Sequence, residues 1–271
     1  MLKIKGENMS KSSDINIQIA LDDITHKFTP ERFSISRLPL KVGRLDSHRF
    51  GTALPSCLDM LIYVPGGEIS LPEVYKYDPA IMDVINQAVA HEDQLMPSWR
   101  DTHYIYITVD QRMITAGRTH RNGGWHFDGM QGIRYPEKLE VCHQYVVSDN
   151  NPTEFSNVVV DATQLDEAKD NWFVELGKQV PDDTELFVPE TYDIMMMTAY
   201  QLHRSPVAKP EHEGQRTFIR MDFTKKKFDR IGNTINPTLP APFEFYPRPL
   251  PFEISPEAKQ SDWKGASQFK S

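Results

Sequence analysis

The sequence predicts a mainly β protein, built as a sandwich or barrel with accessory helices. Short runs rich in β-branched and aromatic residues recur over 103–223, and turn residues separate them. Two segments show the apolar spacing of a helix instead. A content of 39% hydrophobic and 25% charged residues in 271 is typical of a soluble globular protein with one large domain or two small ones. We expect one domain.

Two helices are predicted. In the first, 79–92, Asp78 is a favourable N-cap and Pro79 suits the first turn. Apolar residues then follow at helical spacing, namely Ile81, Met82, Ile85, Ala88 and Val89. The second helix covers 164–177, with an apolar stripe made of Leu165, Ala168, Trp172, Phe173 and Leu176. Both are accessory to the β-rich part of the chain.

Six apolar runs predict the strands. They are "HYIYITV" (103–109), "VCHQYVV" (141–147), "SNVVV" (156–160), "TELFVP" (184–189), "YDIMMMTA" (192–199) and "RTFIRMDF" (216–223). Their length and bounding turn residues favour an all-β core. Apart from the helix at 79–92, residues 1–100 allow no assignment.

The two ends differ from the rest of the chain. Residues 1–14 are polar, and we expect a mobile N-terminal tail before a single domain at 15–236. Residues 237–271 form a proline-rich arm, with seven prolines between 237 and 256, which excludes a helix or a central strand. We expect this extended arm to pack on the barrel through its aromatic residues, Phe243, Phe245, Tyr246 and Phe252.

Charge and composition exclude several classes of protein. The net charge of −8 argues against a partner held through many phosphates, so nucleic acid is not an expected ligand. No apolar run reaches the length of a membrane span, and the N-terminus lacks the apolar core of a signal peptide. The two cysteines, Cys57 and Cys142, make neither a disulfide framework nor a zinc cluster. A cytoplasmic protein is the simplest interpretation.

The most informative stretch is "GGWHFDGMQG", residues 123–132. In an extended segment His126 and Asp128 point to the same side, because side chains two apart share a face. One imidazole and one carboxylate are two thirds of a facial site for iron(II). The pattern also arises by chance, and His91-Glu92-Asp93 is a second match. That match ends the predicted helix, where residues two apart lie roughly 200° apart around the axis, so we do not expect it to chelate a metal.

A third ligand has to come from a distant strand. His203 follows a long apolar strand in "YDIMMMTAYQLHRSPV", although a solvent-facing histidine in a turn is the alternative. Further on, Arg216 and Arg220 lie four apart and share one face of a strand, with Phe218 between them. Burying both unpaired is costly, so an anionic ligand would explain them. The alternatives are that they reach solvent or pair with Asp222 or Glu213.

Taken together, these residues resemble the iron(II)- and 2-oxoglutarate-dependent oxygenases. That family has His-x-Asp, then a distal His, then an Arg roughly ten to fifteen residues later, which maps onto His126, Asp128, His203 and Arg216. "LHRSPV" and "GQRTFIRMDF" resemble the end of this pattern in the prolyl-hydroxylase-like and phytanoyl-CoA-dioxygenase-like branches. The resemblance covers about 100–225. One departure is Thr217-Phe218 after the arginine, so the Arg-x-Ser form of the family is missing.

The resemblance implies a fold and a chemistry. The fold would be a double-stranded β-helix (jelly roll), and His126, Asp128 and His203 would hold the iron(II). The keto-acid end of 2-oxoglutarate would chelate the iron, its distal carboxylate would pair with Arg216, and Arg220 would line the same pocket. With O2, and ascorbate as an optional reductant, the cosubstrate would yield succinate while the substrate is oxidised. Asp128 favours hydroxylation, since halogenating members lack this carboxylate.

The substrate is less determined. Arg118, His120 and Arg121 precede the metal motif and Arg134 follows it, which favours an anionic substrate, unless this is simply a solvated loop. The substrate would be a small metabolite, an amino acid or a protein side chain. The alternative function is a cupin-type metal-binding jelly roll without 2-oxoglutarate chemistry, which would not need Arg216. A nucleic-acid hydroxylase is a weaker third alternative. We expect Trp125 and Phe127 to pack in the barrel wall, as Met195, Met196 and Met197 also would.

Overall fold

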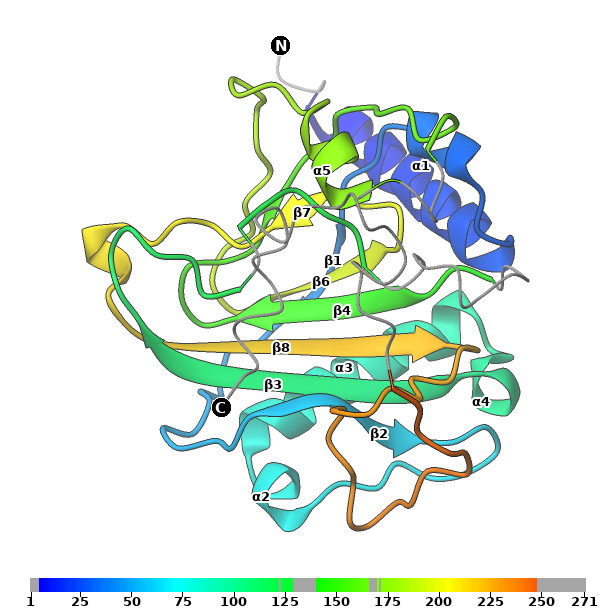
Figure 1. The fold of residues 1–271 in the computed structure, drawn as a ribbon, viewed down its shortest axis with the longest axis vertical. Helices are drawn as coiled ribbons and strands as arrows, with labels where there is room; N and C mark the ends of the chain where they lie inside the picture. The colour runs from blue at the N-terminus through cyan, green and yellow to red at the C-terminus, as the bar shows by residue number, and fades with distance from the viewer. Residues whose placement is uncertain (1–4, 122, 129–139, 166–169, 171, 248–271) are drawn as a thin grey trace.

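A six-stranded antiparallel sheet forms the centre of the protein (Figure 1). The computed structural model describes residues 5–247 except 122, 129–139, 166–169 and 171. The strand order is β1-β6-β4-β8-β3-β2, with bounds β1 Leu40–Arg44, β2 Cys57–Tyr63, β3 Tyr104–Ile114, β4 His143–Ser148, β6 Asp193–Thr198 and β8 Gly214–Thr224. A second sheet pairs β5 Glu154–Phe155 with β7 His203–Arg204. A mainly antiparallel β fold with few helices is therefore confirmed, whereas the jelly roll stays a prediction.

Strand β8 is the centre of this sheet. It pairs with β3 without a break from Gly214–Ile114 to Thr224–Tyr104, and its other edge pairs with β4. Side chains alternate across it. Ile219, Met221 and Phe223 belong to a large core cluster on one side, and Phe218 belongs to a smaller cluster on the other. Both faces of the sheet are therefore covered.

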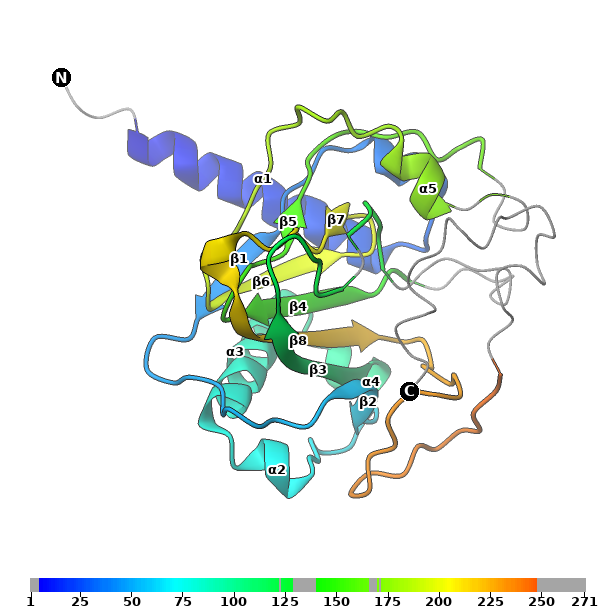
Figure 2. The same ribbon diagram turned by 60° about the vertical axis from the view of Figure 1, so that its left-hand side comes forward.

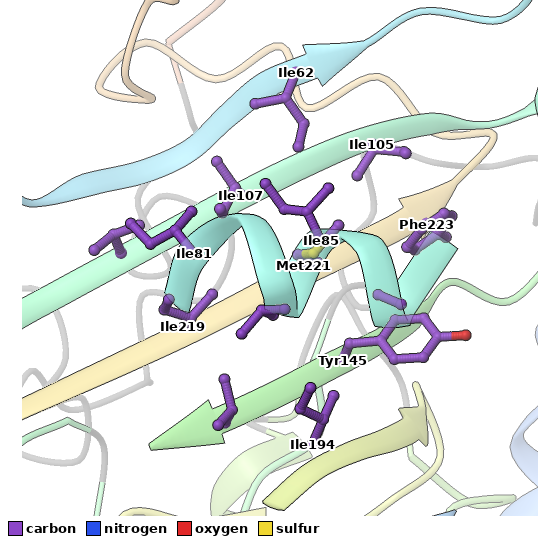
Figure 3. Packing of buried hydrophobic residues seen from close by; sticks show 14 of the residues in the cluster. Ile62, Ile81, Ile85, Ile105, Ile107, Tyr145, Ile194, Ile219, Met221 and Phe223 are labelled. Carbon is purple, nitrogen blue, oxygen red and sulfur yellow. The ribbon is translucent and has the colours of Figure 1, made fainter. Parts of the chain in front are cut away.

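Helix α3, Pro79–Leu95, covers the first face (Figures 1 and 3). Ile81 and Ile85 point from α3 onto the sheet. Asp78 caps the helix, because its Oδ1 accepts hydrogen bonds of 2.9 Å from the backbone N–H of Ala80 and of Ile81. The helix predicted at 79–92 and its cap are confirmed. The other helical elements are α1 Lys5–Thr25, η1 Pro30–Ser34, α2 Glu73–Lys76, α4 Trp99–Thr102, α5 Trp172–Gly177 and η2 Pro210–His212.

The second face lies under the small sheet, on the side away from α3 (Figure 2). A cluster of apolar side chains joins the two sheets, namely Val146, Phe155, Met195, Met197 and Phe218, with Phe187 against them. Met196 points the other way, into the α3 side of the core. The three methionines thus serve packing, as expected. The candidate site described below lies on this second face.

Some elements differ from the expectations. Helix α1 starts at Lys5, inside the segment expected to be a tail. In the predicted helix 164–177, only α5 is helical among the described residues; Gln164 lies in a turn and Ala168 is outside them. In 156–160 the backbone is not in a ladder, because Ser156 N–H bonds Leu202 O and Val158 N–H bonds the Ser156 hydroxyl. The run 184–189 contributes one bridge, between Phe187 and Phe155.

The other runs are strands as predicted, and β1 and β2 come from the part of the chain that had no assignment. In the C-terminal arm Phe243 packs edge-on against Tyr104 at 5.9 Å and Tyr246 is half exposed, while Phe252 lies outside the described residues. Cys57 and Cys142 are buried free thiols. In the part of the chain that the structure describes, no helix is both long and apolar enough to span a membrane.

The cap of α3 is testable. Replacing Asp78 with Ala removes an acceptor from two N–H groups at the helix start and from Gly51 N–H, which lies 2.8 Å from Oδ2. We expect the free energy of unfolding in urea to fall by about 1–2 kcal/mol. Asp78→Asn keeps the capping oxygen and should lose clearly less. If the free energy of unfolding falls equally in the two variants, the hydrogen bonds from Ala80 and Ile81 N–H to the capping oxygen contribute little to stability.

Candidate metal centre

The backbone brings His126 and His203 together. His126 N–H donates to His203 O at 3.0 Å, and His203 N–H donates to His126 O at 2.9 Å. This bridge joins the start of the metal motif to β7. The His203 side chain is only 8% exposed. The alternative of a solvent-facing turn histidine is therefore wrong.

Three side chains converge at this bridge. His126, Asp128 and His203 each offer one ligand atom, and these atoms all lie within 4.8 Å of one another. His203 Nε2 lies 3.6 Å from Asp128 Oδ2, and the two imidazole rings are 4.3 Å apart between centroids. Among the described residues this is the one such group of histidine, cysteine and acidic side chains. It is the trio that the sequence predicts.

Each of the two imidazole rings is held by a hydrogen bond of its Nδ1 atom to a backbone carbonyl. His126 Nδ1 lies 2.7 Å from Gly124 O, and His203 Nδ1 lies 3.0 Å from Gln201 O. A carbonyl oxygen only accepts, so each Nδ1 carries a proton and donates it to the carbonyl. Metal-binding histidines in proteins are usually oriented in this way, by a hydrogen bond from the second ring nitrogen.

The charge states also suit a metal. Burial and the neighbouring His203 ring lower the pKa of His126 to about 4, so His126 is neutral at pH 7. For Asp128 burial alone would raise the pKa, but the charge of Arg220 and the contact with His203 outweigh burial and hold the pKa well below its usual value. Two imidazoles and one carboxylate are a donor set that iron(II) accepts on one face.

Arg220 holds the carboxylate of this set. Its Nη1 donates to Asp128 Oδ2 at 2.8 Å, its Nη2 to Asp59 Oδ1 at 2.6 Å and its Nε to Asp222 Oδ2 at 3.0 Å. Pairing with Asp222 was one of the alternatives, and it is correct for Arg220; Glu213 instead accepts from Ala116 N–H. Three carboxylates face this guanidinium, and Asp59 also has Arg230 Nη2 at 4.0 Å from its Oδ2. A divalent cation beside Asp128 would add positive charge to this cluster.

Burial raises the pKa of Asp222 to about 6, against the opposing effect of Arg220. Asp222 is therefore still mostly ionised at pH 7. Asp59 was missed by the sequence analysis. Asp59 lies on β2, in the part of the chain where the sequence predicted no strand. Its φ of 47° is a left-handed backbone conformation that no sequence motif predicts here.

Arg216 is in a different environment. It is 1% exposed, its Nε donates to Asn150 O at 2.8 Å and to Asn151 O at 3.1 Å, and its Nη1 lies 2.6 Å from His120 Nδ1. Among the described residues no carboxylate makes an ion pair with this guanidinium. Burial lowers the pKa of Arg216 to about 10, so it remains charged at pH 7. Its expected anionic ligand stays a prediction.

Residues of the basic loop before His126 also reach the site. Arg121 Nη1 donates to Asp110 Oδ2 at 3.1 Å, and its guanidinium stacks on Phe218, with Cζ 5.0 Å from the ring centre. His120 is buried, with Nε2 3.3 Å from Asp110 Oδ1. The solvated-loop alternative therefore holds for Arg118, which is exposed, and not for these two. Arg134 lies outside the described residues.

The remaining residues named in the sequence analysis fall into two groups, one far from the candidate site and one beside it. His91 and Asp93 lie on α3, beyond the opposite face of the sheet, where His91 Nδ1 is 2.8 Å from the Tyr145 hydroxyl and Asp93 binds Trp99 and Arg100. Phe127 is fully buried, with its ring 4.9 Å from that of Phe33, as expected for the wall. Trp125 is only partly buried and stacks on Arg204.

The solved structures that are similar to this chain share little sequence with it. No family model matches the chain, and no curated protein matches it in sequence. One similar solved structure is an oxidoreductase of the 2OG-Fe(II) oxygenase family from Burkholderia pseudomallei, 9% identical, with a TM-score of 0.32 over 66% of this chain and 68% of that one. Another is a bsmA homologue from Methylobium petroleophilum PM1, 12% identical, with a TM-score of 0.32 over 61% and 63%. Similarities this low do not transfer an activity.

Metal binding distinguishes the two His-x-Asp matches. We expect His126→Ala to weaken Mn(II) or Fe(II) binding by at least about 100-fold, because the loss of a ligand costs more than the loss of its supporting partner. His91→Ala should leave the affinity unchanged, since His91 bonds Tyr145 on the other face. Anaerobic calorimetric titration measures both, with thermal melting as a check on folding. Equal affinities in the two variants would exclude the proposed ligand set.

Proposed function

We propose that this protein is an iron(II)- and 2-oxoglutarate-dependent dioxygenase that hydroxylates a small metabolite, an amino acid or a protein side chain. We further propose that its two sheets belong to a jelly roll. The observation that carries the proposal is the convergence of His126, Asp128 and His203 within 4.8 Å, with both imidazole rings oriented by a hydrogen bond of Nδ1 to a backbone carbonyl.

The residues present fit iron(II). Two imidazole nitrogens and one carboxylate would occupy one face of the metal and leave the other positions to further ligands. Iron(II), 2-oxoglutarate and O2 would together supply an oxidant for a C–H bond, with release of succinate and CO2. Asp128, which pairs with Arg220 and lies 3.6 Å from His203, supplies negative charge that favours a divalent cation at this place.

The residues of the chain would orient these partners. Arg220 fixes Asp128 through one carboxylate oxygen, so the carboxylate cannot turn away from the two histidines. Gly124 and Gln201 carbonyls fix the rings. Arg216 would bind the distal carboxylate of 2-oxoglutarate, in a two-pronged geometry that guanidinium favours. Apolar side chains around Phe218 would keep water away from this wall.

A cupin-type protein that only holds a metal is the alternative. Such a protein would leave the buried charge of Arg216 without a role, and burying a charge without a carboxylate partner is costly. The oxygenase accounts for the triad and for the arginine together.

The first test is product formation. With iron(II) and 2-oxoglutarate but no added substrate, the protein should release succinate slowly, and metabolite extracts containing the substrate should raise the rate. Asp128→Ala should abolish both. Release at the same rate by the Asp128→Ala variant would point to free iron in solution instead of the candidate site.

The second test concerns the arginine. Arg216→Lys keeps the charge but loses the planar two-pronged geometry, so we expect the affinity for 2-oxoglutarate to fall more than tenfold, or about 2–5 kcal/mol. Iron affinity should stay nearly the same. Anaerobic titration followed by metal-to-ligand absorption measures this, with Arg44→Lys at the exposed sheet edge as control. An unchanged midpoint would remove Arg216 from the cosubstrate site.

A further inference from the structure

Two guanidinium groups lie against one aromatic ring on the site face of the sheet. The Cζ atom of Arg121 is 5.0 Å and that of Arg216 is 5.4 Å from the centre of the Phe218 ring. Arg216 comes from β8, and Arg121 comes from the loop before His126. Two cations beside one ring repel each other in a poorly solvated place, unless an anion lies between them. The lowered pKa of Arg216 has burial as its first cause and the charge of Arg121 as its second.

Asp110, the carboxylate that pairs with Arg121, is not sufficient for both guanidinium groups. Both carboxylate oxygens of Asp110 already accept hydrogen bonds from Arg112, whose Nη2 lies 2.6 Å from Oδ1 and 2.8 Å from Oδ2. Arg121 shares the same carboxylate through a single nitrogen, Nη1. Arg216 reaches the Asp110 carboxylate only through His120. The Nδ1 atom of His120 accepts from the Arg216 guanidinium and therefore carries no proton. Arg112 and Arg121 thus share one carboxylate, and Arg216, which feels the charge of Asp149 as well as that of Asp110, forms no ion pair with a carboxylate among the described residues.

Arg220 differs from these arginines. Each of its three nitrogen atoms already donates to a carboxylate, of Asp59, Asp128 or Asp222. It therefore supports the metal centre and has little capacity for a further anion. The expectation that Arg220 lines the cosubstrate pocket stays a prediction; the second guanidinium beside the Phe218 ring is that of Arg121.

The positions along β8 give the span of the ligand. Arg220 contacts the ligand carboxylate of Asp128, and Phe218 lies two residues away, roughly 7 Å along the strand. A short dicarboxylate with one end at the triad would bring its other end over this ring. Arg216 is 1% exposed, whereas the Arg121 side chain is 24% exposed, so Arg121 is the one that a ligand arriving from solvent meets first.

We propose that Arg121 and Arg216 together bind the distal carboxylate of 2-oxoglutarate over the Phe218 ring. This rests on the proposed function. Arg216 supplies the fixed guanidinium, oriented by His120 and two backbone carbonyls. Arg121 supplies the second, oriented by Asp110, and selects oxo acids that carry a second carboxylate over those that do not.

The test compares two oxo acids on the iron-loaded protein without oxygen. 2-Oxoglutarate carries the distal carboxylate and 2-oxobutanoate lacks it, and metal-to-ligand absorption reports the binding of each. We expect Arg121→Gln to weaken 2-oxoglutarate by about tenfold or more and to leave 2-oxobutanoate unchanged. Arg121→Lys should lie in between. Arg118→Gln, exposed on the same loop, should behave like the wild type. Iron affinity and thermal melting of each variant check the metal centre and the fold.

The outcomes separate the two proposals. If Arg216→Lys weakens 2-oxoglutarate and Arg121→Gln does not, the role of Arg121 is wrong while the proposed function stands. Equal weakening of both oxo acids by Arg121→Gln would also refute it, because the residue would then act on the metal centre and not on the distal carboxylate. If the iron-loaded wild type binds neither oxo acid, the proposed function fails and this inference fails with it.

Discussion

The position of β8 between β3 and β4 is the constraint on which the rest of the structure depends. All of its backbone groups in the middle of the sheet are engaged on both edges, so its side chains have fixed places on two faces. One face carries Ile219, Met221 and Phe223 against α3. The other carries Arg216, Phe218 and Arg220. A shift of one residue in the register would exchange the two sets, placing charges in the α3 core.

That second face is electrostatically divided. Around Arg220 three carboxylates outnumber one guanidinium, and the same place offers two imidazole nitrogens. Around Phe218 the balance is reversed, because Asp110 is shared by Arg112 and Arg121 while Arg216 has only neutral partners. Buried charges of one sign are costly without a counter-charge. A divalent cation at one end and a dicarboxylate reaching to the other would compensate both regions.

The small sheet explains why the triad exists at all. His126 lies on a single backbone bridge to His203, and β7 is held by β5, whose Phe155 packs beneath it. The site is therefore not formed by one continuous strand. It is formed by a short segment that the buried Phe127 and the backbone of β7 fix against the main sheet. The orientation of both rings by backbone carbonyls follows from the same local geometry.

Local patterns were sufficient for the elements whose residues carry their own signal. The helix at 79–92 has its cap and its apolar spacing within one stretch, and the runs that became β3, β4, β6 and β8 are long enough to be recognised. The three side chains of the candidate metal centre could be predicted to meet because a facial site of two histidines and one carboxylate needs particular residue types, and the same-face argument depends only on a spacing of two.

Only the tertiary structure decided which charges meet. Asp59 reaches Arg220 from β2, Asp110 reaches Arg121 from β3, and neither position carries a local pattern that marks it. The spacing of four between Arg216 and Arg220 predicted that they share a face of the strand, but it carried no information about their partners. Those partners come from strand order and register, which depend on contacts between residues far apart in the chain. By itself the sequence determined the types of side chain available to the site and their periodicity; folding determined which of them became neighbours, since pairing energies are set by distance in space.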